Sequence, residues 1–254
     1  MAFTIAFAGK GGTGKTSLAG LTIKYLLKKN KQPILAVDAD SNACLNEALG
    51  LKVHATVGRL REESLDAVRS GERPGGMAME ELFDYQVQQS LIESKGIDLM
   101  VMGRPEGPGC YCAANNIIRK YTDILSEKYP YVVIDNEAGM EHLSRRTTHA
   151  VDMLFIVSDP TVKGLQTAKR INELVDELKL DIKKRVVVIN RVPDSGQDQL
   201  QKLADSYGLE VGVMIPQDSA IADIDLKGAP IIDLSDEAVS YTALSDLLDR
   251  VLAQ

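Results

Sequence analysis

Near the N-terminus the chain reads Gly9-Lys10-Gly11-Gly12-Thr13-Gly14-Lys15-Thr16-Ser17. This stretch satisfies the pattern G-x-x-x-x-G-K-[ST], and it lies between an apolar run at 3–8 and a helical pattern at 15–29. Glycines let backbone N–H groups turn toward phosphate oxygens, Lys15 brings positive charge to the β- and γ-phosphates, and the Thr16 hydroxyl can bind Mg²⁺. The sequence therefore predicts a nucleoside triphosphate site formed by residues 9–17.

Apolar runs rich in valine and isoleucine alternate with helical patterns along the rest of the chain. A continuous apolar run is typical of a parallel strand that is covered on both faces. The predicted strands are 3–8, 33–37, 99–102, 131–134, 153–157, 185–189 and 211–215, and the clearest helices are 15–29, 161–178 and 238–252. This alternation predicts an α/β fold with a doubly wound, mostly parallel sheet flanked by helices. We expect a single domain over 1–254 with an insertion at about 51–96.

Composition excludes several classes of partner. Hydrophobic residues make up 44% of the 254 residues, which is enough to bury a core without disulfides. Lys and Arg total 29 against 36 Asp and Glu, and the resulting charge of −7 argues against binding to nucleic acid or to an anionic membrane. Because no apolar run approaches the roughly 18 residues of a membrane span and no signal peptide is evident, we expect a cytoplasmic protein.

Acidic residues follow two of the predicted strands. Asp38 and Asp40 come directly after the strand at 33–37, and Asp135 ends the strand at 131–134. Open α/β sheets bind ligands at the carboxyl ends of their strands, and carboxylates near a triphosphate need a cation between them. We predict that Asp38 and Asp135 join Thr16 around Mg²⁺ and that Asp40 orients the attacking water. An alternative is that the two aspartates cap the short helix that starts near Asn42.

The identity of the nucleotide is argued from residues after the last strands. Asn190 ends one strand and can bind adenine, but the chain lacks the aspartate three residues later that guanine recognition uses. The later segment Ile215-Pro216-Gln217-Asp218 resembles a base-flanking loop of a family of ATPases, and this resemblance implies that Pro216 and Gln217 flank the base. A dinucleotide would not require Lys15 followed by Thr16, so the sequence predicts ATP with Mg²⁺.

Two of the three cysteines, Cys110 and Cys112, lie in a Gly/Pro-rich loop at 103–116 that leads into a helix. A helix N-terminus favours the thiolate, which binds soft and borderline metals. One pair of thiolates makes a poor site, whereas two loops in a symmetric dimer would supply four ligands to Ni²⁺ or Zn²⁺. The spacing alone also fits a redox pair or incidental packing. Cys44 is expected to be a buried free cysteine.

The early lysine places the phosphate loop in a subgroup. Lys-Gly-Gly-x-Gly-Lys-Thr resembles the deviant Walker A motif of the MinD, ParA, Mrp and nitrogenase iron protein superfamily. The resemblance implies a homodimer in which Lys10 reaches into the partner's site. There it would act with Lys15 and Asp40 in catalysis, as an arginine finger does, whereas the spacing alone also fits a solvated surface lysine.

The cysteine loop and the segment 135–145 extend the resemblance. Together with the phosphate loop they resemble the CooC family of ATPases over nearly the whole chain. That family assists nickel insertion into carbon monoxide dehydrogenase, and related members serve acetyl-CoA synthase. The resemblance therefore implies a nickel-handling maturation ATPase with one of these enzymes as its client. Two features depart from the pattern: Ser41-Asn42 stands where many relatives have proline soon after the second aspartate, and Asn136-Glu137 adds an acid of unassigned role.

Two other functions compete with this one. A MinD- or ParA-like positioning ATPase would share the phosphate loop, but the C-terminal segment 236–254 is acidic and suits neither a lipid surface nor DNA. An ATP-dependent reductase that carries an iron–sulfur cluster would hold the cluster on interfacial thiolates and would absorb visible light.

Overall fold

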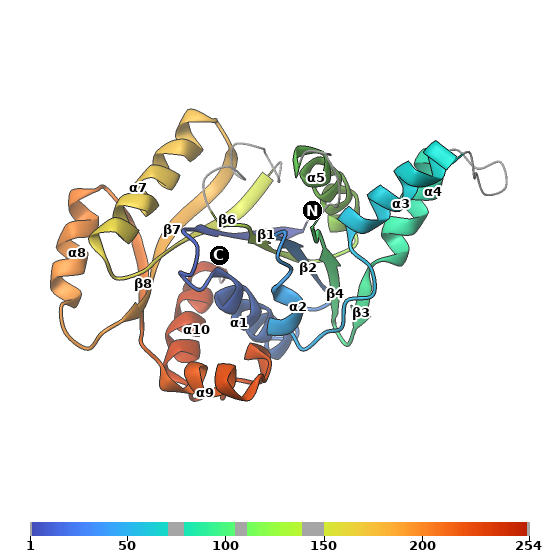
Figure 1. Ribbon diagram of the computed structural model, residues 1–254. Coiled ribbons are helices and arrows are strands. Elements are labelled where there is room, and N and C mark those ends of the chain that lie inside the picture. Colours follow the sequence, from blue (N-terminus) through green and yellow to red (C-terminus); the bar gives the residue numbers. More distant parts are fainter. Residues whose placement is uncertain (1, 71–78, 105–110, 139–149, 253–254) are drawn as a thin grey trace.

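The computed structural model describes residues 2–70, 79–104, 111–138 and 150–252. These residues contain an eight-stranded sheet with the strand order β3-β4-β2-β5-β1-β6-β7-β8 (Figure 1). The strands are β1 (Phe3–Gly9), β2 (Ile34–Ala39), β3 (Ile92–Ser94), β4 (Ile97–Val101), β5 (Tyr131–Asn136), β6 (Ala150–Ser158), β7 (Asp181–Val192) and β8 (Val211–Pro216). Every neighbouring pair is parallel except β3 and β4. The predicted doubly wound, mostly parallel sheet is confirmed.

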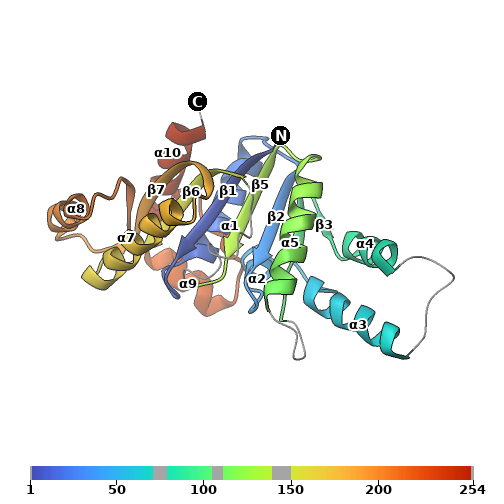
Figure 2. The ribbon, with the colours of Figure 1, turned by 90° about the horizontal axis from the view of Figure 1, so that it is seen from above.

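Helices cover both faces of the sheet (Figures 1 and 2). One face carries α1 (Lys15–Lys28), α10 (Val239–Leu252) and the short η1 (Ile231–Asp233), and the other carries α5 (Tyr111–Ser126), α7 (Val162–Glu177) and α8 (Gln197–Ser206). Alternate residues of one strand therefore enter two different cores: Ile5 and Phe7 pack with α1, while Ala6 and Ala8 face the opposite core. This two-sided burial is the reason that the strands read as continuous apolar runs.

The seven predicted strands are all present, with different ends. β6 and β7 extend at both ends beyond the predicted runs at 153–157 and 185–189, because strand pairing continues past the apolar runs. The prediction missed β3, a three-residue antiparallel edge strand with two exposed polar residues. So short a strand leaves no periodic signal.

The segment predicted as an insertion contains two helices and β3. α3 (Val57–Ser70) and α4 (Met79–Gln89) lie beyond the β3 edge of the sheet (Figure 2). Asp84 of α4 accepts a hydrogen bond from the Tyr121 hydroxyl of α5 and forms an ion pair with Lys120 at 3.3 Å. These contacts join the helical pair to the helix that carries Cys112.

The C-terminal helix α10 packs on α1. Its buried face includes Tyr241, Leu244 and Leu248, so this apolar surface is already used in the core. Asp249 pairs with Lys29 of α1 at 2.7 Å, and Asp236, which precedes α10, pairs with Lys28 at 2.6 Å. Among the described residues, the chain forms no helix with the length and apolar character of a membrane span.

Candidate functional site

The phosphate loop connects β1 to α1 as the sequence predicts, and its backbone is held by its own side chains. The carbonyl oxygen of Lys10 accepts hydrogen bonds from the Thr13 hydroxyl at 2.9 Å and from the Lys15 ammonium at 3.3 Å. Gly14 has φ +96°, and a side chain there would also collide with the amide of Asn190. Lys15 is buried, whereas Lys10 is exposed. The loop therefore points one lysine inward and leaves the other accessible to a second molecule.

Thr16 and Asp135 lie together at the carboxyl end of β5. The Thr16 hydroxyl donates to Asp135 Oδ2 at 2.5 Å. The other carboxylate oxygen, Oδ1, is buried and accepts no hydrogen bond from the described residues. A buried carboxylate oxygen without a partner is costly unless a cation or water reaches it. The hydroxyl and carboxylate oxygens are donors that suit Mg²⁺, so the predicted magnesium residues Thr16 and Asp135 fit this ion.

Asp38 lies beside Asp135 because β2 and β5 pair with these two residues in register. Its Oδ1 accepts the backbone N–H of Asp40 at 3.0 Å, and its Oδ2 accepts that of Leu45 at 2.8 Å. Leu45 is the first residue of α2 (Leu45–Ala48), which starts three residues later than the capping alternative assumed, and only Asp38 of the two aspartates accepts an N–H of that helix. Asp40 in turn accepts the N–H of Asn42 at 2.8 Å. The two aspartates thus fix the loop that follows β2, and roles toward magnesium and water stay predictions.

Burial is the largest influence on the pKa values of Asp38, Asp135 and Lys15. It raises the pKa of Asp38 to about 7, against hydrogen bonds from Leu45 and Asp40 that lower it. It raises the pKa of Asp135 to about 6, and Thr16 and Lys15 oppose this shift. Burial also lowers the pKa of Lys15, while the negative charges of Asp135, Asp40 and Glu137 raise it. A cation bound beside these two carboxylates would lower their pKa values toward the ordinary range and so favour their charged forms.

The metal-free protein is expected to lose stability as the pH rises from about 4 to about 7. A carboxyl group whose pKa is higher in the folded state than in the unfolded state binds its proton more tightly when folded, so deprotonation favours unfolding. For Asp38 the pKa rises from 3.8 to about 7, which corresponds to a loss on the order of a few kcal/mol. Urea unfolding in a chelator, repeated across this pH window, measures the effect. The slope should flatten in Asp38→Asn, and an unchanged slope would contradict the assignment.

Asn190 and Arg191, at the end of β7, hold the phosphate loop from the side. The Asn190 amide donates to the carbonyl of Thr13 at 2.9 Å and accepts the N–H of Arg191 at 3.0 Å. The Arg191 guanidinium donates to the carbonyl of Gly12 at 3.0 Å, and its backbone is left-handed with φ 59°. The predicted contact of Asn190 with adenine stays a prediction, and in this structure its amide is used on the phosphate loop.

Replacing Asn190 with alanine is expected to weaken ATP binding by about tenfold, the scale of one buried hydrogen bond. The Thr13 carbonyl would lose its partner, and the phosphate loop would lose a support that aligns its N–H groups. Isothermal titration calorimetry with ATP measures the change. Lys202→Ala, at an exposed position of α8, is the control and should bind ATP as the unchanged protein does. An equal affinity in Asn190→Ala would show that the phosphate loop does not need this support.

The end of β8 lies beside the end of β7, which carries Asn190 and Arg191. The Gln217 N–H donates to the Val192 carbonyl at 2.9 Å, which places the predicted base-flanking residues Pro216 and Gln217 next to the end of β7. Asp218 fixes this loop, because its carboxylate accepts the N–H of Ala220 at the start of α9 (Ser219–Lys227) and both the N–H and hydroxyl of Ser240 in α10.

The prediction that Cys44 is buried is wrong. Cys44 is exposed and lines an open hollow of about 280 Å³ with Thr16 and Ser17 of the phosphate loop. It precedes α2 in a polar loop that is held at the edge of the site, so its neighbours do not enclose it. Partial burial and, after it, the charge of Asp38 raise the pKa of the thiol and keep it protonated.

Of the two predicted metal ligands, one lies outside the described residues and the other lies close to that boundary. Cys110 lies outside the described residues, and Cys112 is the second residue of α5. Within the described ranges, no three His, Cys, Asp or Glu side chains are grouped so that they could hold a metal ion. The thiolate site therefore remains a prediction.

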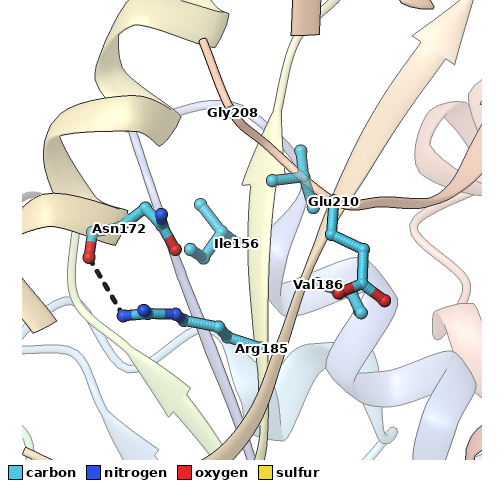
Figure 3. Close-up of a pocket in the computed structure, with 7 residues that line it drawn as sticks. Ile156, Asn172, Arg185, Val186, Gly208 and Glu210 are labelled. Carbon is cyan, nitrogen blue, oxygen red and sulfur yellow. Dashed lines mark hydrogen bonds between the residues drawn. The ribbon is translucent and has the colours of Figure 1, made fainter. Parts of the chain in front are cut away.

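A second hollow lies away from the phosphate loop, between α7, β7 and the approach to β8 (Figure 3). Its volume is about 170 Å³. Arg185 crosses it and donates to the Asn172 carbonyl at 3.1 Å and to the Asp176 carboxylate at 2.7 Å. Its cation is thus already paired, and none of the predicted site residues lines this hollow.

Two contacts of the site were not anticipated from the sequence. Arg191 was not singled out, although a basic residue directly after the strand-end Asn190 could have suggested a contact with the phosphate loop. Glu137 was noted without a role, and its carboxylate accepts a hydrogen bond from the Ser41 hydroxyl at 3.4 Å.

Comparison with known proteins agrees with this geometry. Residues 4–231 match the CobQ/CobB/MinD/ParA nucleotide binding domain. The chain is 42% identical to an ATP-binding protein of Methanocaldococcus jannaschii, with 98% of each chain covered. It is 32% identical to the carbon monoxide dehydrogenase accessory protein CooC of Rhodospirillum rubrum, with 97% of each covered. The solved MinD cell division protein of Aquifex aeolicus is 21% identical, with a TM-score of 0.70 over 100% of this chain and 98% of that one.

A phosphate loop at the head of α1, backed by a strand-end aspartate on a mostly parallel sheet, defines a P-loop ATPase. The chain belongs to the CobQ/CobB/MinD/ParA nucleotide-binding family. Within that family it is similar to CooC over nearly its whole length.

Proposed function

We propose that this protein is a maturation ATPase that assists nickel insertion into carbon monoxide dehydrogenase or acetyl-CoA synthase. The observation that carries the proposal is the 32% identity to a carbon monoxide dehydrogenase accessory protein, which extends over 97% of both chains. Similarity over this length extends well beyond the phosphate loop. Under this proposal the protein acts in the cytoplasm, where its client would be assembled.

Nickel is the cargo in this proposal, and Cys110 and Cys112 are its ligands. Two subunits would each present one pair of thiolates, which gives the four sulfur ligands of a closed site for Ni²⁺ or Zn²⁺. α5 follows β4 and carries Cys112 in its first turn. Since the phosphate loop follows the parallel strand β1, both elements start from carboxyl ends of strands in the same sheet. That arrangement supports a link between nucleotide binding and the thiolates.

ATP would join the two subunits. The exposed Lys10 is available to a partner's triphosphate, and the residues proposed to hold Mg²⁺, Thr16 and Asp135, lie in contact. In the proposed cycle the homodimer closes on ATP and magnesium, brings the two cysteine loops together around nickel, and reopens after hydrolysis to ADP and phosphate.

The test is activation of a nickel-free client by the purified protein. Nickel-free carbon monoxide dehydrogenase is incubated with Ni²⁺, ATP and this protein, and carbon monoxide oxidation is followed. We expect faster activation than with Ni²⁺ alone, and loss of that gain in Lys15→Ala, which removes the phosphate-loop charge. Activation of neither carbon monoxide dehydrogenase nor acetyl-CoA synthase would overturn the proposal. Visible absorption from a bound cluster would instead support the reductase alternative.

A further inference from the structure

The residues that follow β2 and β5 leave the sheet side by side, and Ala138, after β5, lies beside Gly11 of the phosphate loop. Asp38 pairs with Asp135 and Ala39 with Asn136 in the sheet, so the next residues of the two strands leave it side by side. Ser41 lies on one of these loops and Glu137 on the other. The Ser41 hydroxyl donates to Glu137 Oε1 at 3.4 Å. The two positions at which the sequence departs from its family or carries an unassigned acid are thus in contact with each other.

The loop after β2 is held at its base and meets its neighbour through Ser41. Asp38 accepts N–H groups at 3.0 and 2.8 Å from Asp40 and Leu45, so both ends of this loop are tied to one carboxylate. The hydroxyl of Ser41 lies between these ties and reaches across to Glu137. The distance of 3.4 Å is long for a hydrogen bond between oxygens, so the expected effect of removing this contact is modest.

Glu137 is directed toward the site. Both Glu137 and Ser41 are only partly exposed, and the negative charge of Glu137 reaches the buried ammonium of Lys15. A carboxylate at this position would repel the negative charge of a triphosphate, so Glu137 is not expected to bind the phosphates itself. Its hydrogen bond to Ser41 gives it another task, which is to hold the neighbouring loop.

We propose that Glu137 is a positioning residue for ATP hydrolysis, which acts through Ser41 to hold the loop after β2, and with it Asp40, against the phosphate loop. The hydrogen bond itself includes none of the groups predicted to bind the phosphates, and only the charge of Glu137 also acts on Lys15. It should therefore influence the chemical step more than the affinity for ATP. This inference concerns the ATPase reaction and does not depend on nickel or on the client.

The test is steady-state ATP hydrolysis by the full chain carrying substitutions at the two positions. Ser41→Ala and Glu137→Ala are each expected to lower kcat by about fivefold, the scale of one modest hydrogen bond. In Ser41→Ala, which keeps the charge of Glu137, KM for ATP should stay within about twofold of its original value. The double variant should be no slower than the slower of the two single variants, because both substitutions remove the same contact.

Conservative variants separate the contact from charge and from folding defects. Ser41→Thr keeps a hydroxyl, and Glu137→Gln keeps an oxygen that can accept it, so both should retain at least about half of kcat. Glu63→Gln, in an exposed ion pair with Arg59 on α3, is the control and should be unchanged. The proposal is overturned if the alanine variants keep the original kcat, if their losses multiply in the double variant, or if Glu137→Gln is as slow as Glu137→Ala.

Discussion

A turnover at least about 10³-fold below that of the unchanged protein is expected for Lys10→Ala, the scale of a cation supplied to a phosphoryl group by a second molecule. The Lys10 side chain is exposed, whereas its carbonyl oxygen holds Thr13 and Lys15. Alanine keeps that carbonyl, so the phosphate loop and its affinity for ATP should survive while hydrolysis fails. Phosphate release and ATP titration measure the two effects separately.

A mixing experiment shows whether Lys10 acts within its own subunit or across a dimer. Lys10→Ala and Asp40→Ala subunits are each expected to be inactive alone. In a mixed dimer the Lys10→Ala subunit keeps its own Asp40 and receives a lysine from its partner, which completes one site. Recovery of hydrolysis on mixing is therefore expected. Without recovery, or with Lys10→Ala near the original rate, the contribution across the dimer is refuted.

Replacing both Cys110 and Cys112 with serine is expected to remove all bound nickel or zinc, from about one ion per two chains to none. Serine hydroxyls do not replace thiolates as ligands for these metals at neutral pH, so two loops would no longer form a site. Metal analysis after anaerobic purification, with and without ATP, measures the stoichiometry, and sizing of the same samples measures dimerisation.

Two controls belong with this substitution. Cys44→Ser changes the exposed cysteine beside the phosphate loop and should leave the metal content unchanged. ATP affinity should be the same in all variants, because none of them alters the phosphate loop. Full metal content in the Cys110/Cys112 double variant would place the ions elsewhere in the protein.

Much of the fold could be predicted because its signals are local. The glycines and lysine of the phosphate loop follow an apolar run directly, and the strand–loop–helix order is explicit in residues 3–28. Burial on both faces makes each long strand a continuous apolar segment, so seven strands were recognisable. β3 was not, since three residues at a sheet edge need only backbone pairing with β4.

The hydrogen-bond partners of the site residues could not be predicted from the sequence in the same way. Asn190 donates to Thr13, 177 positions away, and this contact depends on the order β1-β6-β7 in the sheet. The position of Asp38 in the site could be predicted because it ends a strand. Its hydrogen bond with the N–H of Leu45 could not, because that contact depends on the turn of the following loop. Cys44 was misplaced because general burial preferences for cysteine do not account for a polar loop at the edge of an open site.

The attachment of the phosphate loop to β7 determines which part of the protein can sense the state of the nucleotide. Asn190 and Arg191 secure the carbonyls of Thr13 and Gly12. A phosphate loop that is held in its binding conformation needs little reorganisation when phosphates bind. This favours affinity, but a segment that does not change cannot distinguish ATP from ADP. The difference between ATP and ADP would then be registered by other parts of the site, and Ser41 and Glu137 connect two candidate segments, which follow β2 and β5.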